Sequence, residues 1–501
     1  MTSVLALDQG TTGSTALVIA DDGRVIGRGY GEITQHFPRP GWVEHDPEEI
    51  WRVTMEAARA AVRAAGGPPA AIGITNQRET VVVWDRATGR PLHRAIVWQD
   101  RRTADRCRAL RAEHGDANLR ERTGLVWDPY FSATKIEWLL GEVPGLRGRA
   151  ERGEVVFGTI DAWLVARLTR GDRVATDHTN ASRTLLYHLA TRTWDPDLLQ
   201  LFGVPPVALP DVVRSSGVVG TADKSHLGAP IPVAGIAGDQ QAALWGQACW
   251  TPGMAKCTYG TGAFLLMLAG DQQPHGGDGG RLLRTMACDA TGEPALALEG
   301  SVFIAGAAIQ WLRDGLGVIA RADEAEGMAR SVPDTGGVYF VPAFVGLGAP
   351  HWEADARGTI VGLTRGTARP HLVRAALEAM AYSTREVVER MVAETGAALE
   401  SLRADGGAAA NPWLMQFQAD TLGVPVERPD VVETTALGAA GLAGIATGVW
   451  ASAAEFAAGR RYEVFRPAGD PPGGYAGWQR AVDTALHWAR PGLPLRGPDR
   501  I

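Results

Sequence analysis

The sequence has few cysteines and little net charge, and both shortages exclude classes of function. Its four cysteines, Cys107, Cys249, Cys257 and Cys288, include no CxxC pair, so neither a disulfide framework nor a zinc site is expected. The formal net charge of the 501-residue chain is −7, which argues against binding to nucleic acid or to an anionic membrane surface. The N-terminus also lacks the basic region of a signal peptide, so we expect a cytoplasmic protein.

Several catalytic motifs are missing as well. No GxxxxGK[ST] phosphate loop is present and no GxGxxG follows an expected strand, which disfavours P-loop nucleotidases and NAD enzymes. The HExxH and GxSxG motifs are also absent. One long uncharged run occurs at residues 434–454, but it consists mainly of Ala, Gly and Thr. That composition favours a buried helix packed on a sheet over a membrane span, so no membrane insertion is expected.

What the sequence contains is the mixture of short strands and helices that is typical of an α/β protein. Apolar runs separated by turn residues predict a β-meander at 4–7, 16–19 and 25–26. A helix is expected from Pro47 to about Ala65, with Asp46 as its N-cap and Glu49 completing a capping box. Strands are then predicted at 71–74 and 80–84, on either side of the loop 76–79.

The second half of the chain repeats this plan. A strand is expected at 232–236, and another precedes the turn Tyr259-Gly260-Thr261-Gly262, which matches the earlier turn Asp8-Gln9-Gly10-Thr11. This repetition indicates an internal duplication into two α/β domains, 1–245 and 246–501, with a ligand cleft between them. The remaining expected features are a long helix at 370–394, a strand and turn at 402–407, a helix after Asn411 and a surface loop at 271–280.

The turn after the first strand has the composition of a phosphate-binding turn. Gly10 lets a ligand approach the backbone closely, and Thr11 and Thr12 offer hydroxyl and amide donors. Asp8, at the end of the strand, could hold Mg²⁺ through its waters. Many turns of this composition have no ligand, so the motif by itself does not assign a function.

Charged and aromatic residues elsewhere are candidates for substrate chemistry, each with a structural alternative. Asp239 precedes a helix expected at 240–246, where it is either the N-cap or a general base that takes a proton from a hydroxyl. Arg78 and Glu79 would be solvated on a strand, but in a loop both can turn inward and bind vicinal hydroxyls. Three aromatic residues are either core residues or the apolar wall of a small-ligand pocket, namely Trp98, Tyr130 and Phe264.

Taken together, these segments resemble the FGGY carbohydrate kinase family and, within it, the glycerol kinases. The resemblance covers essentially the whole chain and is carried by LALDQGTTGS, GWVEHDPEEIW, GITNQRET, GIAGDQQAALWGQ, TYGTGAFLLM and LRADGGAAANPWLMQFQ, among other stretches. It implies two actin-like, ribonuclease-H-like domains, with mixed sheets flanked by helices and a ligand cleft between them. It also implies transfer of the γ-phosphate of ATP to glycerol, with Mg²⁺ as cofactor, in a homo-oligomer (dimer or tetramer).

The resemblance implies a role for each candidate residue. The hydroxyls of glycerol would be bound by Arg78, Glu79, Tyr130, Asp239 and Gln240, with Asp239 as the general base. Trp98 and Phe264 would pack on its carbon face. The nucleotide site would be lined by Thr11, Thr12, Gly13, Thr261, Gly306, Gln310, Gly407 and Asn411. Asp8, through water, and Asp239 would hold the magnesium ion.

The chain departs from the family pattern at a few positions. Thr15 stands where glycerol kinases usually carry a basic residue, Gly13 where a serine is common, and Cys257 where Asn is common. Some members bind a sugar bisphosphate through a Gly-Gly-Thr-Arg loop, which corresponds here to Leu227-Gly228-Ala229-Pro230. Because the arginine is missing, we expect fructose 1,6-bisphosphate not to inhibit through this loop, which an activity titration would check.

Three functions are compatible with these features of the sequence. The first is a glycerol kinase, the second a sister kinase for another polyol or ketose such as erythritol or xylulose, and the third a non-enzymatic actin-like ATP-binding protein. The set Arg78, Glu79, Trp98 and Tyr130 favours the first over the second. Asp239 together with this set disfavours the third, because a nucleotide switch needs no polyol site.

Overall fold

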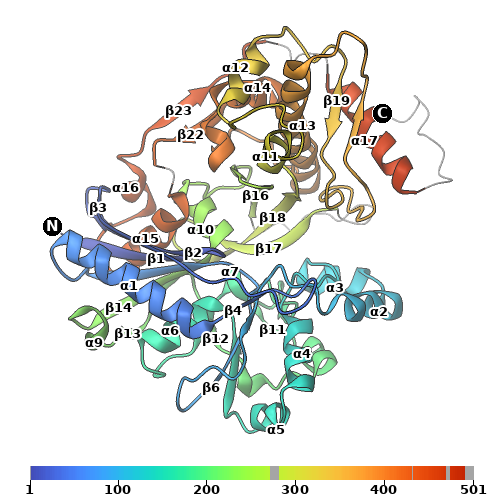
Figure 1. Cartoon of the computed structure of the whole chain (residues 1–501). Helices are drawn as coiled ribbons and strands as arrows, with labels where there is room; N and C mark the ends of the chain where they lie inside the picture. The colour runs from blue at the N-terminus through green and yellow to red at the C-terminus, as the bar shows by residue number, and fades with distance from the viewer. Residues whose placement is uncertain (1, 271–280, 432, 470–473, 491–501) are drawn as a thin grey trace. The chain divides into compact units, whose positions relative to one another are not determined.

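The computed structural model describes residues 2–270, 281–431, 433–469 and 474–490, which form two compact units (Figure 1). Unit 1 comprises Met1–Thr251, Arg284–Ala297 and Glu433–Gly459, and unit 2 comprises Pro252–Leu283, Leu298–Val432 and Arg460–Ile501. The chain therefore returns to unit 1 twice after first leaving it. The boundary that we placed at residue 245 stays a prediction, and the loop expected at 271–280 lies outside the described residues.

Unit 1 is built on a six-stranded mixed sheet. Its strand order is β13 (Ser216–Ala222), β14 (Ile231–Gly238), β5 (Ala71–Asn76), β1 (Ser3–Gln9), β2 (Gly13–Ala20) and β3 (Val25–Glu32). β1, β5 and β14 are parallel to one another, and the other neighbours are antiparallel. The N-terminal meander predicted from the apolar runs is therefore confirmed as β1, β2 and β3.

Helices cover both faces of this sheet (Figure 1). On one face lie α1 (Pro47–Ala65) and α6 (Ile160–Leu168), whose apolar residues share a core with alternate residues of β1 and β5. As expected, α1 begins after Asp46, whose side chain accepts the Glu48 N–H. The predicted capping box is wrong, because Glu49 accepts from the backbone N–H and the hydroxyl of Thr34 instead. The Glu49 carboxylate, which the local spacing assigned to the cap, is therefore bonded to a residue outside the helix.

The opposite face is covered by α15 (Thr434–Ala446), which confirms the buried helix predicted in the long uncharged run. Its contacts with the sheet are between backbones, since a methyl group on Gly73 would lie 2.1 Å from the Ala439 carbonyl oxygen. Gly438 of α15 approaches α10 (Asp239–Gly246) in the same way, since a methyl group on Gly438 would lie 1.9 Å from the Ala242 carbonyl oxygen. Among the described residues, no helix is long and apolar enough to cross a membrane.

Unit 2 contains most of a seven-stranded sheet whose topology repeats that of the first. The order is β17 (Leu283–Cys288), β18 (Pro294–Val302), β16 (Ala263–Gly270), β15 (Ala255–Tyr259), β21 (Leu402–Asp405), β22 (Val426–Pro429) and β23 (Tyr462–Phe465). β15 is antiparallel to β16 and parallel to β21, as β1 is to β2 and β5. β22 and β23 correspond in the same way to β14 and β13. The internal duplication inferred from the two turns is thus visible in the strand pairing.

The long helix expected in the second half is α13 (Arg369–Thr395), and it packs in the core of unit 2. The other helices of this unit are α11 (Gly306–Asp314), α12 (Glu324–Arg330), η2 (Gly407–Ala410), α14 (Pro412–Leu422) and α17 (Tyr475–Ala489), and its minor strands are β19 (Tyr339–Val341) and β20 (Thr359–Val361).

The remaining elements of unit 1 are short. The strands are β4 (Glu44–His45), β6 (Val82–Asp85), β7 (Ala95–Ile96), β8 (Val155–Gly158), β9 (Ala175–Asp177), β10 (Tyr187–His188), β11 (Thr193–Trp194) and β12 (Asp211–Val213). The helices are α2 (Ala104–His114), α3 (Ala117–Thr123), α4 (Ala133–Glu142), α5 (Leu146–Glu151), α7 (His178–Ala181), α8 (Pro196–Phe202), η1 (Pro206–Ala208), α9 (Lys224–Leu227) and α16 (Ala453–Ala457). The strand expected at 80–84 begins two residues later, because the chain still turns at Thr80, whose N–H donates to the Arg78 carbonyl.

Candidate active site

The candidate site of unit 1 lies where two neighbouring parallel strands end. β5 ends at Asn76 and β14 ends at Gly238, and these two residues are paired across the sheet. The loop 77–79 and the first turn of α10 therefore start side by side, although about 160 residues separate them in the sequence. Carboxyl ends of parallel strands are the usual place for ligand sites in α/β sheets.

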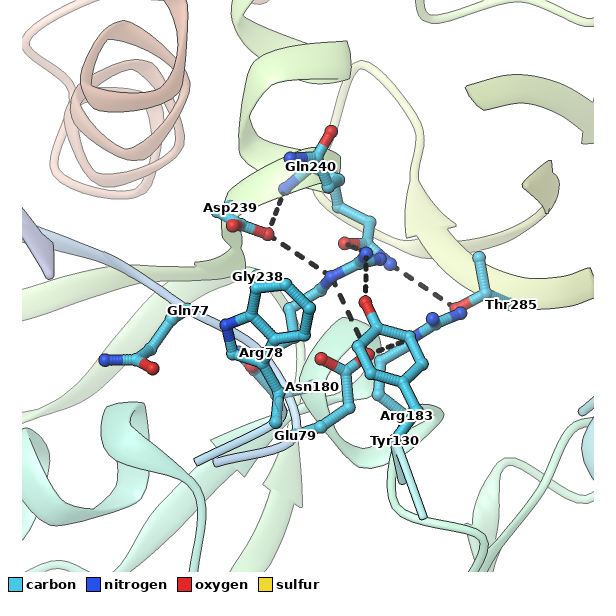
Figure 2. Close-up of polar contacts among 12 residues, drawn as sticks. Gln77, Arg78, Glu79, Tyr130, Asn180, Arg183, Gly238, Asp239, Gln240 and Thr285 are labelled. Atoms are coloured by element: carbon cyan, nitrogen blue, oxygen red, sulfur yellow. Dashed lines mark hydrogen bonds and ion pairs between the residues drawn. The ribbon is translucent and has the colours of Figure 1, made fainter. Parts of the chain in front are cut away.

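Arg78 is the centre of the polar cluster at this edge (Figure 2). Its side chain is buried, and its Nε lies 3.2 Å from Asp239 Oδ1 and 3.9 Å from Glu79 Oε1. Its two terminal nitrogens donate to Gln241 Oε1 at 3.3 Å and to the Tyr130 hydroxyl at 3.4 Å. Gly238 makes room for it, since a methyl group there would lie 2.8 Å from Arg78 Cδ.

Glu79 also turns inward, as the loop alternative predicted. Its side chain is 1% exposed and its backbone has a φ of 61°, a left-handed conformation that few non-glycine residues adopt. Its backbone carbonyl accepts a hydrogen bond from Ser132 Oγ at 2.9 Å. Its carboxylate forms an ion pair of 2.7 Å with Arg183 Nε. The contacts of the backbone carbonyl and of the carboxylate therefore hold Glu79 in this unusual backbone conformation.

Asp239 is the most accessible charged group of the cluster, with 34% of its side chain exposed. The N-cap of α10 is Gly238, so Asp239 is the first helical residue and not the cap. Its Oδ1 accepts the N–H of Gln240 at 2.7 Å and faces Arg78. A carboxylate held by two donors and still open to solvent is placed to accept a proton from a bound hydroxyl.

Asp8 lies near Asp239 at the end of β1. Burial and, to a lesser extent, the negative charge of Asp239 together raise the pKa of Asp8 from 3.8 to about 7. Two carboxylates that repel each other at a strand end are stabilised by a cation. Within the described ranges, no group of three or more His, Cys, Asp or Glu side chains could hold a metal ion. A cation here would therefore be coordinated largely by water and by oxygens of a bound phosphate ligand.

Aromatic residues connect the polar cluster to the turn after β1. The indole N–H of Trp98 donates to Thr11 Oγ1 at 2.9 Å, and its ring meets that of Tyr130 edge-on at 5.5 Å. Both rings are half-buried, so each presents a face. Two residues predicted for different ligands, Thr11 for the nucleotide and Trp98 for the polyol, are thus in direct contact.

The turn itself is held by amide side chains that sequence reasoning missed, of which Gln77 is buried and Gln35 is half-buried. Gln77 Nε2 donates to Gln9 Oε1 at 3.0 Å and to the Gly10 carbonyl at 3.2 Å, and Gln35 Nε2 donates to the Thr11 carbonyl at 2.6 Å. His45 contacts both Gln35 and Gln77, and burial lowers its pKa to about 4, so it stays neutral at physiological pH. The carbonyls of the turn are therefore fixed in position.

A second support, also missed, lies beneath the strand ends. The buried Asp177 carboxylate accepts from Thr179, Asn180 and Ser215 side chains at 2.7–3.0 Å. Thr179 Oγ1 in turn accepts the Gly238 N–H at 2.8 Å, and Asn180 exchanges side-chain hydrogen bonds with Asn76. Burial raises the pKa of Asp177. No motif could have shown this, because its partners are defined only by the fold.

The nucleotide residues predicted in the second half all lie in unit 2. The Thr261 carbonyl accepts from Ala305 and Ala307 N–H groups, and the Gly260 carbonyl accepts from Gly306 at the start of α11. Gly406 packs on the backbone of Tyr259, which places η2 beside the same turn. Gln310 and Gly407 are exposed, whereas Asn411 caps α14 through Leu414 N–H. Phe264 lies in β16 of this unit, next to the turn.

The two departures in the first turn have a structural setting. A methyl group at Gly13 would lie 2.5 Å from the Gly31 carbonyl oxygen, so β3 as it stands leaves no room for a serine. Thr15 is paired with Asp8 across the β1–β2 hairpin. The residue that replaces the family's basic side chain is therefore the strand partner of the carboxylate with the raised pKa.

Family models match both halves of the chain. The N-terminal domain of the FGGY family of carbohydrate kinases matches residues 3–246, and the C-terminal domain of the same family matches residues 255–447. The chain belongs to the FGGY family of carbohydrate kinases.

Relatives within the FGGY family match over nearly their full length. A glycerol kinase of Alkalilimnicola ehrlichii is 55% identical over 98% of this chain and 99% of its own, and one of Carboxydothermus hydrogenoformans is 56% identical over 97% and 98%. The crystal structure of Plasmodium falciparum glycerol kinase with ADP is 36% identical, with a TM-score of 0.91 over 97% of this chain and 98% of its own. The recognised family and the two-domain α/β fold are thus confirmed, and the fold is that of an ATP-utilising kinase.

Proposed function

We propose that this FGGY kinase transfers the γ-phosphate of ATP to glycerol, giving sn-glycerol 3-phosphate and ADP. The observation that carries the proposal is the buried Arg78–Glu79 pair beside the accessible Asp239. Glycerol is small and offers little apolar surface, so it must be selected through its hydroxyls. A site that presents both donors and acceptors to hydroxyl groups rejects analogues that lack them. The similarity to proteins named glycerol kinase supports this choice of substrate.

In this mechanism, the residues of unit 1 bind and orient the alcohol. Arg78 donates to one hydroxyl, Glu79 accepts from its neighbour, and Asp239 accepts the proton of the hydroxyl that attacks the phosphorus atom. Tyr130 and Trp98 would provide the apolar wall for the carbon chain, and Gln240 belongs to the same proposed set. Phe264, which was predicted with them, lies in unit 2. Phosphoryl transfer needs mainly alignment and charge neutralisation, so no covalent intermediate with the protein is required.

Mg²⁺ fits the residues present near the first turn. The pKa of Asp8 is raised because burial and the charge of Asp239 disfavour its ionised form. A divalent cation held through water would offset both unfavourable effects. When bound, Mg²⁺ neutralises charge on the phosphates of ATP. Asp8 and Asp239 are the residues that would hold it.

The nucleotide contacts are proposed for the two turns. Thr11, Thr12 and Gly13 of unit 1 would offer donors to phosphate oxygens, and Thr261, Gly306, Gln310, Gly407 and Asn411 of unit 2 would contact the rest of ATP. We further propose a cytoplasmic enzyme that forms a dimer or tetramer. The four cysteines are all buried as free thiols, which supports a reducing compartment.

Replacing Arg78 by alanine should raise KM for glycerol by about 100-fold or more, because the glycerol hydroxyl loses its proposed donor and the buried Glu79 and the accessible Asp239 lose a nearby cation. KM for ATP should change little. Steady-state kinetics at varied glycerol and fixed saturating ATP would measure the effect. Arg106→Ala is a control for the loss of an arginine, since Arg106 pairs with a glutamate, Glu137, outside this cluster. An unchanged KM for glycerol in Arg78→Ala would remove Arg78 from the site.

The substrate itself is tested by ADP release from the purified protein with Mg-ATP and a panel of glycerol, erythritol, xylulose, ribulose and dihydroxyacetone. We expect glycerol to stimulate turnover far above the others. A preference for another polyol or ketose would keep the kinase assignment and change the substrate. No stimulation by any of them would favour a non-enzymatic ATP-binding protein.

A further inference from the structure

Arg183 is a buried arginine beside the proposed polyol site, to which no role has yet been given. It is 0% exposed, and its Nε donates to the Glu79 carboxylate at 2.7 Å (Figure 2). Its guanidinium carbon lies 5.6 Å from the ring centre of Tyr130 and 5.3 Å from that of Phe131. It therefore contacts two residues proposed to bind glycerol.

The chain around Arg183 is held by a local hydrogen bond and by contacts with one other segment of unit 1. Its N–H donates to the Asn180 carbonyl at 3.0 Å. The preceding residue, Ser182, shares a hydrogen bond with Thr285 Oγ1 at 2.9 Å and accepts the Met286 N–H at 3.1 Å. A buried side chain that leaves a fixed backbone and packs against two aromatic rings has little freedom to follow its partner, so the position of Arg183 sets that of Glu79.

The distances within the cluster divide the charges into two pairs. Arg78 Nε is nearer to Asp239, at 3.2 Å, than to Glu79, at 3.9 Å. The close partner of Glu79 is Arg183, at 2.7 Å. A buried carboxylate that loses its close partner is strongly destabilised. Without Arg183, the nearest cation for Glu79 would be Arg78, and movement of the two toward each other would take Arg78 away from Asp239.

We infer that Arg183 is a positioning residue for glycerol recognition. It holds the Glu79 carboxylate apart from Arg78, so that Glu79 can accept from a substrate hydroxyl while Arg78 remains with Asp239. Arg183 acts through Glu79 and does not itself touch the substrate. This inference rests on the proposed function, because Glu79 and Arg78 serve glycerol only if glycerol is the substrate.

The test compares wild type, Arg183→Met and Arg183→Lys in the full-length protein. Arg183→Met should raise KM for glycerol between about tenfold and 100-fold, which is the cost of misplacing a binding group by about 1 Å. KM for ATP should stay within about threefold of wild type. Arg183→Lys keeps the charge but loses the planar group that packs on the rings, so its KM for glycerol should lie between that of wild type and that of Arg183→Met.

Arg102→Met is the matched control for burial. The Arg102 side chain is also 0% exposed, pairs with Asp100 and Glu44 at 2.8 Å, and packs over Trp42 and Trp138. Its loss should lower Tm, as the loss of Arg183 does, but should leave KM for glycerol unchanged. The comparison separates positioning of Glu79 from a general loss of stability.

A double-mutant cycle with Glu79→Gln tests whether Arg183 acts through Glu79. If it does, Arg183→Met should add no more than about a twofold increase in KM for glycerol once Glu79→Gln is present. Full additivity, or unchanged KM for glycerol in both Arg183 variants, would overturn the inference. If Arg183→Met does not fold, the same comparison with Arg183→Lys decides. A wild type that does not phosphorylate glycerol would instead overturn the proposed function, and this inference with it.

Discussion

Asp239→Asn should lower kcat for glycerol phosphorylation by about 10²–10⁴ and leave the fold intact, because general-base catalysis supplies a factor of that size. Asparagine has nearly the same shape as aspartate, and its carbonyl oxygen can still accept the Gln240 N–H that Asp239 accepts at 2.7 Å. It cannot take a proton from the attacking hydroxyl. KM for ATP should be nearly unchanged. Rapid-quench measurement with saturating glycerol and ATP would separate the rate constant of the phosphoryl-transfer step from product release.

Asp223→Asn is the control for this variant. Asp223 has a similarly accessible side chain, with 33% exposed, faces Arg170 at 3.8 Å and accepts the Ser225 N–H at 2.9 Å at the start of α9. Its replacement should leave kcat at the wild-type value. Turnover by Asp239→Asn within a few-fold of wild type would show that another group, or bulk water, accepts the proton.

Asp8→Asn should stabilise the protein in the absence of Mg²⁺ and weaken its activation by Mg²⁺. The pKa of Asp8 is about 7 in the folded protein and 3.8 in the unfolded chain, so the folded state holds the proton more tightly. Stability from this group is therefore present below pH 3.8 and is lost as the pH rises through 7. At pH 8 the charged carboxylate carries its full penalty, and asparagine removes it. We expect a Tm at least about 2 °C above wild type at pH 8, with a smaller difference at pH 5.

The loss of function in the same variant should appear in the Mg²⁺ titration. A residue that orients metal-bound water typically contributes 10–100-fold to metal affinity or activity, so the half-activating Mg²⁺ concentration should rise by about that factor. Asp161→Asn is the control, because burial also raises the pKa of Asp161 to about 7 but its neighbours are Asp177, Thr159 and Thr176. That variant should keep the wild-type Mg²⁺ dependence. A wild-type titration curve for Asp8→Asn would remove Asp8 from the metal site.

The parts of the fold that sequence predicted well were those set by local patterns. The hairpin turns at Gly10 and Gly260 were found because small residues between apolar runs have few other conformations, and in both the glycine N–H bonds to a carbonyl two or three residues later. The helix start at Asp46 was found for the same reason. The capping box failed because Glu49 has a partner, Thr34, from a different segment, and no local rule could anticipate it.

The candidate site shows the same division. Arg78, Glu79 and Asp239 were selected from short motifs, and the fold places them within one polar cluster. Arg183 and Gln241, which hold them, were missed. Gln241, whose Oε1 accepts a hydrogen bond from Arg78, was not among the predicted residues, since sequence alone does not show which residue of the first helical turn faces Arg78. Arg183, the partner of Glu79, lies 104 residues away in the sequence, and only the fold brings the two side chains together.

The contact between α15 and the first sheet also bears on the order in which the protein is made. Gly73 and Gly235 are shaped to receive a helix backbone that begins at Thr434, about 180 residues after the chain first leaves unit 1. At 5–20 residues per second, a ribosome needs roughly 10–40 s to synthesise that interval. During this time one face of the sheet lacks its native cover and presents apolar strands to solvent. We therefore expect the nascent chain to bind chaperones that recognise exposed apolar segments, and a chain that terminates before Thr434 to lack the helix that covers this face of the sheet.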